Sequence, residues 1–188
     1  AKKENNKQSW SISVLPSSLR LDPTTNKIIE ERFAAVKNGL AEKGNLLEKN
    51  WIYDGKNVSL KSARSEYISF QIIITNNNPD STLKGIKIEI PSFKNATKKF
   101  KIKPELCLEW SVNVKTPSTG YPKASLGKGW YPDALIPFKY IQDDTLKAKR
   151  RLVYPLWLPD FNNRIDNQRS LLIWVDQYIP FAYEVAKP

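Results

Sequence analysis

The chain has 188 residues, which is the size of one domain or of two small ones. Its composition, with 40% hydrophobic, 11% aromatic and 26% charged residues, is that of a globular protein rather than a disordered one. Histidine and methionine are absent, and Cys107 is the single cysteine. These counts exclude a Ser-His-Asp triad, a Cys-His dyad, a histidine-based metal site and an internal disulfide.

The net charge is +11, from thirty Lys and Arg residues against nineteen Asp and Glu residues. An excess of this sign and size is found in proteins that bind nucleic acids. The densest lysines, between Lys84 and Lys103, are interleaved with isoleucine and phenylalanine. Residues that look like the exposed aromatic side chains on which single strands stack are not interleaved with them. We therefore interpret the charge as a solvated surface. We expect no nucleic-acid partner, and nucleic-acid binding remains the third hypothesis.

The first residues, AKKENNKQ, are polar and charged. They predict a flexible lead-in over 1–9, of the kind that follows the cleavage site of secreted or lipid-anchored bacterial proteins. We therefore expect a periplasmic, cell-surface or secreted protein. We expect no transmembrane segment, because no run of 18 apolar residues occurs.

Alternating apolar and polar residues predict several short strands, separated by Pro, Gly, Asn and Asp. The most regular is 66–75, in which Ile and Phe face one way while Tyr67, Ser69 and Gln71 face the other. A hairpin is predicted over 51–60, around an Asp-Gly turn. Further strands are predicted over 10–15, 86–90, 100–103, 106–114 and 170–179.

One segment departs from the strand pattern. Apolar residues at helical spacing predict a helix over 31–42, which Asn26 would cap. The spacing is carried by Ile29, Phe33, Val36 and Leu40. The alternative is that 22–26 is a hairpin turn between two short strands, with Ile28 and Ile29 in the second.

Prolines and glycines are frequent between 115 and 152, and this region predicts long ordered loops. Many short strands with frequent turns predict an all-β fold. We expect an antiparallel β-sandwich of the Ig-like or jelly-roll-like type, with one short helix and long ordered loops. We expect it to form a single domain over 10–188.

Aromatic residues give the strongest binding signal in the sequence. Trp130 and Tyr131 lie between a glycine and a proline, and Trp157 lies between two prolines. Aromatic residues in loops stack on sugars or bases, fill interfaces, or close the ends of a core. Arg64 and Glu66 flank the start of the strand 66–75, where they either pair with each other or face a partner.

Three segments carry motifs that occur together in a known family. Residues 59–71 are similar to an A-R-x-E-x-x-S-F-Q strand, 129–137 to a Y-P-D-x-L-x-P loop that includes Asp133, and 167–180 to a W-V-D-x-x-x-P strand. In their order and spacing over 50–188 they resemble the N-terminal β-sandwich of glycoside hydrolase family 123 and its relatives.

The resemblance implies a particular architecture. In that family the sandwich precedes a TIM barrel, whose Asp-Glu pair supports substrate-assisted cleavage of β-linked N-acetylgalactosamine. A catalytic barrel is then expected beyond Pro188, and the sandwich is expected to be truncated near its C-terminal end.

The leading hypothesis is a non-catalytic module of a secreted glycoside hydrolase-like protein, which packs against the catalytic barrel and assists glycan binding. We expect no catalytic residue, metal or cofactor in this chain. The alternative is an independent carbohydrate-binding module that uses the loop aromatics. The candidate residues for glycan or interface contacts are Trp130, Tyr131, Asp133, Trp157, Arg64 and Glu66.

Overall fold

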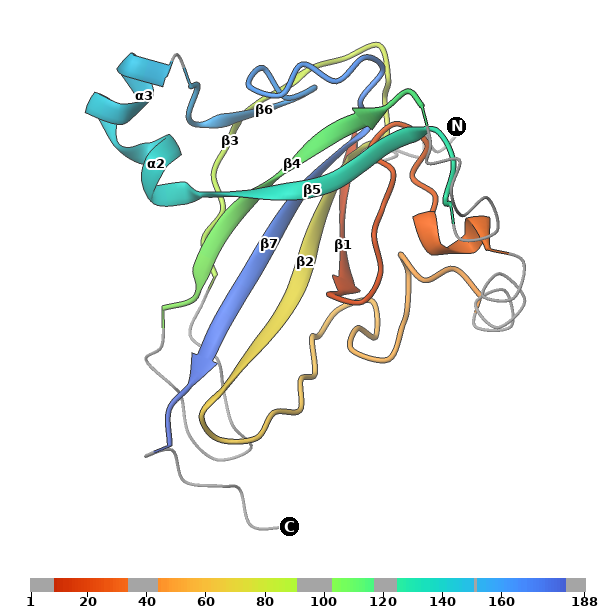
Figure 1. Cartoon of the computed structure of the whole chain (residues 1–188), viewed down its shortest axis with the longest axis vertical. Helices are drawn as coiled ribbons and strands as arrows, with labels where there is room; N and C mark the ends of the chain where they lie inside the picture. Colours follow the sequence, from red (N-terminus) through yellow and green to blue (C-terminus); the bar gives the residue numbers. More distant parts are fainter. Residues whose placement is uncertain (1–8, 34–43, 91–102, 117–124, 151, 182–188) are drawn as a thin grey trace, which may run out of the picture.

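The computed structural model describes residues 9–33, 44–90, 103–116, 125–150 and 152–181 (Figure 1). The chain has an all-β, sandwich-like fold, with two antiparallel sheets and short helices. This confirms the predicted fold class. No helix within the described ranges is long and apolar enough to cross a membrane.

The larger sheet has five strands in the order β1-β2-β7-β4-β5. In this sheet β2 and β7 pair in antiparallel orientation, with Glu66 opposite Ile179 at one end and Thr75 opposite Ser170 at the other. Both strands are rich in β-branched residues, which pack well on a pleated surface. The strands are β1 (Trp10–Pro16), β2 (Glu66–Asn76), β4 (Glu105–Val114), β5 (Gly129–Pro137) and β7 (Ser170–Ile179).

The smaller sheet covers part of one face of the larger one. It pairs β3 (Leu83–Ile86) with β6 (Leu156–Leu158). Two short helices, α2 (Phe138–Gln142) and α3 (Asp144–Arg150), follow β5 directly. The core between these layers is apolar and includes Ile74, Leu108, Phe138, Ile141, Leu156, Leu158, Leu171 and Ile173.

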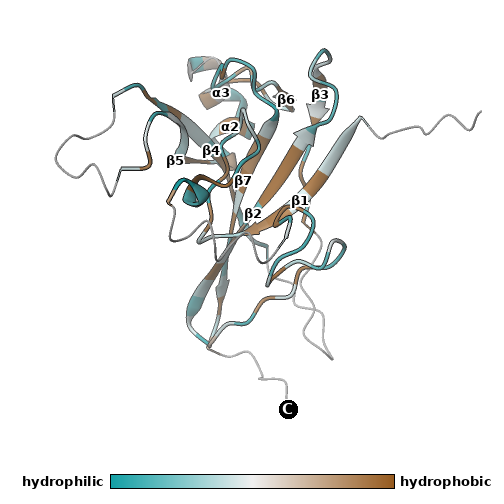
Figure 2. Cartoon of the chain, turned by 90° about the vertical axis from the view of Figure 1, so that its right-hand side faces the viewer, coloured by the Kyte–Doolittle hydropathy of each residue, from teal (hydrophilic) through white to brown (hydrophobic). Residues whose placement is uncertain are grey.

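The opposite face of the larger sheet is covered over only part of its length. Ile73 and Leu172 on this face pack against Leu19, Leu21 and Leu46, from the segment between β1 and β2. Figure 2 shows hydrophobic colour along the middle of β2 and β7 and more hydrophilic colour toward their lower ends. The five-stranded sheet therefore buries both faces in its middle, but not along its whole length.

The predicted helix over 31–42 is wrong where the structure describes it. A single 3-10 turn, η1 (Ile29–Arg32), ends at Phe33 in extended conformation, while 34–42 lies outside the described residues. The alternative is confirmed in part: Leu21 pairs with Ile28 across a turn, and the amide of Asp22 donates to the carbonyl of Lys27. The pairing is an isolated bridge rather than two strands, and Ile29 belongs to the 3-10 turn. The Asp22 carboxylate accepts from the backbone of the turn, which favours it over a helix.

The prediction of long ordered loops over 115–152 is also wrong. This region contains β5, α2 and α3. Two prolines and one unpaired residue interrupt the alternation of β5, so the strand lacks a regular period in the sequence. Residues 117–124 and 151 lie outside the described ranges.

Of the remaining strand predictions, most are confirmed and one is misplaced. Strands 10–15, 66–75, 106–114 and 170–179 are confirmed as β1, β2, β4 and β7, and Tyr53 pairs with Val58 in the predicted hairpin. The strand predicted over 86–90 is misplaced, because β3 ends at Ile86. Residues 100–102 and most of the lead-in lie outside the described residues, and the extent of the single domain stays a prediction.

Candidate functional site

The residues predicted to form an aromatic loop lie on β5. Trp130 is opposite Asn113 and Tyr131 is opposite Val112, and both side chains are half-buried. The register shifts between Trp110 and Ser111, which leaves exposed Asp133 as the extra residue of a bulge. The loop placement of Trp130 and Tyr131 is therefore corrected: they are parts of an edge strand.

Tyr131 is fully engaged by its own chain. Its hydroxyl donates to the Gly127 carbonyl at 2.8 Å and accepts from Arg32 Nη1 at 2.8 Å. The Arg32 guanidinium also lies 5.3 Å from the tyrosine ring centroid, and its Nη2 pairs with Asp22 Oδ2 at 2.9 Å. This arrangement joins β5 to the N-terminal hairpin. It occupies both the hydroxyl and the ring of Tyr131, which are the groups that a sugar would contact.

Trp157 lies on β6, in the other sheet, where it is half-buried. Lys84 Nζ lies 4.8 Å from its ring centroid, and Phe161 meets it edge-on at 5.8 Å and 62°. A flat sugar-binding surface needs coplanar exposed rings, and the two rings here are steeply tilted. Trp157 therefore does not form a flat surface with Phe161.

Arg64 and Glu66 contact different neighbours. The Arg64 guanidinium lies 5.5 Å from the Phe181 ring centroid, and Glu66 Oε2 accepts from the Ala63 amide at 2.9 Å. Both residues are exposed at the lower end of β2. This end of the sheet carries the most prominent aromatic surface that the structure describes.

We call this surface the open sheet face, and it consists of Tyr67, Ser69, Trp174, Asp176 and Tyr178. Cross-strand register brings the residues together, because Tyr67 lies opposite Tyr178 and Ser69 lies opposite Asp176. Residues two apart in a strand share a face, so Trp174 and Asp176 follow Tyr178 on the same side. The described residues that pack on Ile73 and Leu172 on this side leave both tyrosines exposed.

The two tyrosines are unusually exposed for paired aromatic residues. Tyr67 is 70% exposed and Tyr178 is 41% exposed, although their ring centroids are only 5.2 Å apart, at a tilt of 47°. Phe181, just beyond β7, is 72% exposed. Contiguous exposed aromatic surface of this kind marks interaction sites in soluble proteins.

Asp176 is fixed within the open sheet face. Its Oδ1 accepts from Trp174 Nε1 at 2.7 Å and from the hydroxyl of Ser69. Its Oδ2 has no hydrogen-bond partner among the described residues, so it remains available to a donor on another molecule. The face thus offers two exposed tyrosine rings, tilted by 47° to each other, next to a pre-oriented acceptor.

The sequence contained part of this signal. The alternation of β2 already separated Tyr67 and Ser69 from the isoleucines, and a tyrosine on the polar side of a strand is a candidate surface contact. The sequence did not reveal that Tyr178 is opposite Tyr67, because register depends on which strands pair.

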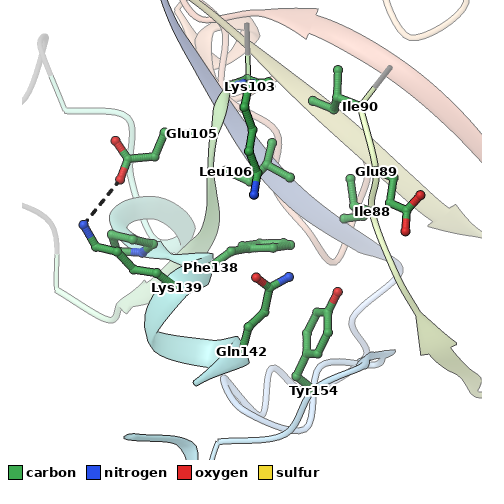
Figure 3. A pocket seen from close by; sticks show the side chains of 12 residues that line it. Ile88, Glu89, Ile90, Lys103, Glu105, Leu106, Phe138, Lys139, Gln142 and Tyr154 are labelled. Atoms are coloured by element: carbon green, nitrogen blue, oxygen red, sulfur yellow. Dashed lines mark ion pairs between the residues drawn. The ribbon is translucent and has the colours of Figure 1, made fainter. Parts of the chain in front are cut away.

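A pocket of about 600 Å³ lies on the other side of the sheet (Figure 3). Its apolar wall includes Ile88, Ile90, Leu106 and Phe138, and its polar residues include Lys103, Gln142 and Tyr154. Lys139 and Glu105 at its edge pair with each other at 3.8 Å.

The most perturbed carboxyl group in the described structure is Glu109, on β4. It is buried, and burial raises its pKa from 4.5 to about 8. Its Oε1 has no hydrogen-bond partner within the described ranges. No cluster of three or more Cys, Asp or Glu side chains suited to a metal occurs there either.

No protein-family profile matches the chain, and no curated protein matches it.

Proposed function

We propose that this chain is a non-catalytic β-sandwich module of a secreted glycoside hydrolase-like protein, and that the open sheet face packs against the catalytic domain. The observation that carries the proposal is the exposure of the adjacent, tilted rings of Tyr67 and Tyr178. Aromatic residues are enriched in interface cores, where each buries a large area.

The resemblance to glycoside hydrolase family 123 supports the class of partner. Two of the three segments that carry it, 59–71 and 167–180, include the paired strands β2 and β7. These are the strands that form the open sheet face. The proposal places the protein in the periplasm or at the cell surface, where such enzymes meet glycans.

The chemistry of the face suits a domain contact. Asp176 supplies a fixed acceptor, and Arg64 beside Phe181 supplies donors at the margin. A polar margin around an apolar centre is typical of domain interfaces that bury 600–1,500 Å² in general.

Hydroxyl-radical footprinting of tyrosine side chains tests the contact. The isolated chain is compared with the full product of the parent reading frame. We expect Tyr67 and Tyr178 to be strongly labelled in the isolated chain and protected in the full protein. Tyr140, exposed on α2 at 38%, is the internal control and keeps its labelling. Equal labelling of Tyr67 in both proteins contradicts the proposal, as does a parent that has no further domain.

The non-catalytic part of the proposal has its own test. We expect the isolated chain to leave aryl β-N-acetylgalactosaminides intact. Hydrolysis by this chain, abolished by substituting one of its carboxylates, would refute it.

Carbohydrate binding by the chain itself is the second candidate function. The observation that favours it is that Asp176 Oδ2, which accepts from no donor in the described part of the chain, lies next to exposed rings. Sugars combine apolar faces with hydroxyl donors, so such a surface suits them. In this case Tyr67→Ser and Tyr178→Ser would both abolish binding of an N-acetylgalactosamine oligosaccharide to the isolated chain. Trp157→Phe, in the other sheet, is the matched control and keeps binding. No detectable binding by the unmodified chain removes this candidate.

A further inference from the structure

We propose that the pocket between α2, the start of β4 and residues 88–90 binds an organic anion: a carboxylate attached to an apolar body. The site lies on the opposite side of the sheet from the open sheet face, and it is independent of the proposed docking function. Its volume of about 600 Å³ lies within the general range of small-molecule sites, which is about 300–1,000 Å³.

The apolar half of the pocket is preformed. Phe138 is buried at the start of α2 and holds the Tyr154 ring edge-on, with ring centroids 6.2 Å apart. Ile88 and Ile90 are half-buried and alternate with exposed Lys87 and Glu89. A rigid apolar surface of this kind takes up an aromatic or aliphatic body with little ordering cost.

The polar half of the pocket has unused donors. Figure 3 shows the Lys103 ammonium pointing toward Phe138 from one side, and the Gln142 amide and the Tyr154 hydroxyl on the other side of this ring. None of the three groups has a hydrogen-bond or ion-pair partner in the described part of the chain. One cation with two neutral donors around an apolar surface matches a carboxylate better than a cation or a neutral polar group.

The charges at the rim leave Lys103 as the group that selects the ligand. Lys139 is already paired with Glu105 at 3.8 Å. The remaining rim carboxylate, Glu89, points away from the Lys103 ammonium in Figure 3. The pocket therefore has a positive centre even though its rim carries both signs.

Paired probes with the same apolar body test the inference. The ¹⁵N-labelled chain is titrated with 4-phenylbutyrate and with 4-phenylbutan-1-ol, and amide shifts are followed by NMR. We expect both ligands to shift residues 88–90, 105–106 and 138–142, and the acid to bind about tenfold more tightly, as a charge-assisted hydrogen bond predicts.

Three variants separate charge from shape. Lys103→Met keeps the aliphatic stem, so we expect it to bind the alcohol normally and to lose the tenfold preference for the acid. Lys139→Met is the matched control, because it removes an equal charge at the edge and is expected to keep the preference. Tyr154→Phe keeps the ring contact with Phe138 and should weaken acid binding about threefold.

Several results would overturn the inference. Equal affinity of the native chain for the acid and the alcohol would do so, as would a preference that survives Lys103→Met. Shifts on the open sheet face instead of the pocket would overturn it too, and so would no saturable shift up to about 10 mM of acid.

Discussion

Two carboxyl groups on one face of the same sheet have opposite environments. Glu109 lies in the covered part, where it is buried and its Oε1 has no partner in the described structure. Asp176 lies in the open part, where the Trp174 indole and the Ser69 hydroxyl donate to it. Cys107 opposite Trp174 and Glu105 opposite Asp176 establish that these residues of β4 and β7 share a face.

The difference shows that one part of a sheet can stabilise the fold while another part of the same face is open to a partner. In the covered part, the segment between β1 and β2 packs on Ile73 and Leu172 and excludes water. In the open part nothing described covers Tyr67, so its ring is available to a partner. The boundary is Gln71, whose buried amide donates to the Pro16 and Leu19 carbonyls and so fixes where the covering turn ends.

The largest predicted effect concerns pH and Glu109. Its folded-state pKa of about 8 is above the unfolded value of 4.5, so the native state keeps a proton that the unfolded state releases between these pH values. The stability contributed by this group is therefore present below about pH 4.5 and lost as pH rises through 8. We expect a loss on the order of 4 kcal/mol between pH 5 and 9, measured by urea denaturation.

Glu109→Gln is the matched variant, because it keeps the shape and cannot ionise. We expect its free energy of unfolding to lack this decline over the same pH interval. An identical decline in both proteins would show that the effect comes from other groups.

The second effect contrasts core and surface isoleucines. Ile73→Ala removes a fully buried side chain from the covered part, and we expect a loss of about 3 kcal/mol from its transfer and cavity terms. Ile12→Ala, on the exposed side of β1, should cost less than about 1 kcal/mol. Urea denaturation at pH 6 measures both, and equal losses would contradict the division of the sheet.

The third effect concerns the contact between Arg32 and Asp22. Arg32→Lys keeps the charge but cannot reach Asp22 and Tyr131 together, because both bonds use the planar guanidinium. We expect a loss of about 2 kcal/mol. Arg169→Lys, at an exposed position, is the control and should change the unfolding free energy little. A loss of the same size in the control would mean that the guanidinium geometry is unimportant.

The smallest effect is expected at the open sheet face. Tyr67→Ser should change the unfolding free energy by about 0.5 kcal/mol or less, because the ring is largely solvated in the isolated chain. A large loss would show that Tyr67 supports the fold, and would weaken its assignment as a contact for another domain.

The predictable part of the fold was the part with a regular alternation or a long apolar run. Residues 66–71 alternate and 171–175 are five consecutive apolar residues, and the structure pairs the two strands that contain them, β2 and β7. By contrast, β5 includes Pro132, Pro137 and a bulge at Asp133, so its hydrogen-bonded partners could not be inferred from spacing. In the segment 86–90 the burial alternates as expected, but pairing with the three-residue strand β6 stops at Ile86.

Local hydrogen bonds also determined whether the N-terminal segment forms a helix or a turn. The spacing of Ile29 and Phe33 fits a helical face, yet the Asp22 side chain binds the amides of Thr24 and Thr25 and stabilises a turn instead. For the candidate aromatic residues the placement in loops was wrong, while their role in binding stays a prediction. Trp130, Tyr131 and Trp157 are flanked by turn-forming residues, but each lies in a strand, and the rings of Tyr131 and Trp157 contact cationic side chains of their own chain. Exposure depends on which distant segment covers a face, and no local pattern contains that information.

The Arg32 side chain has a consequence for how the molecule opens. It donates to the carbonyls of Leu126 and Lys128 as well as to Tyr131 and Asp22, and so binds the start of an edge strand to residues about a hundred positions earlier in the chain. An edge strand alone would exchange its amide hydrogens early. Because one guanidinium joins them, the start of β5 and the N-terminal hairpin should open as a single cooperative unit, with the same opening free energy.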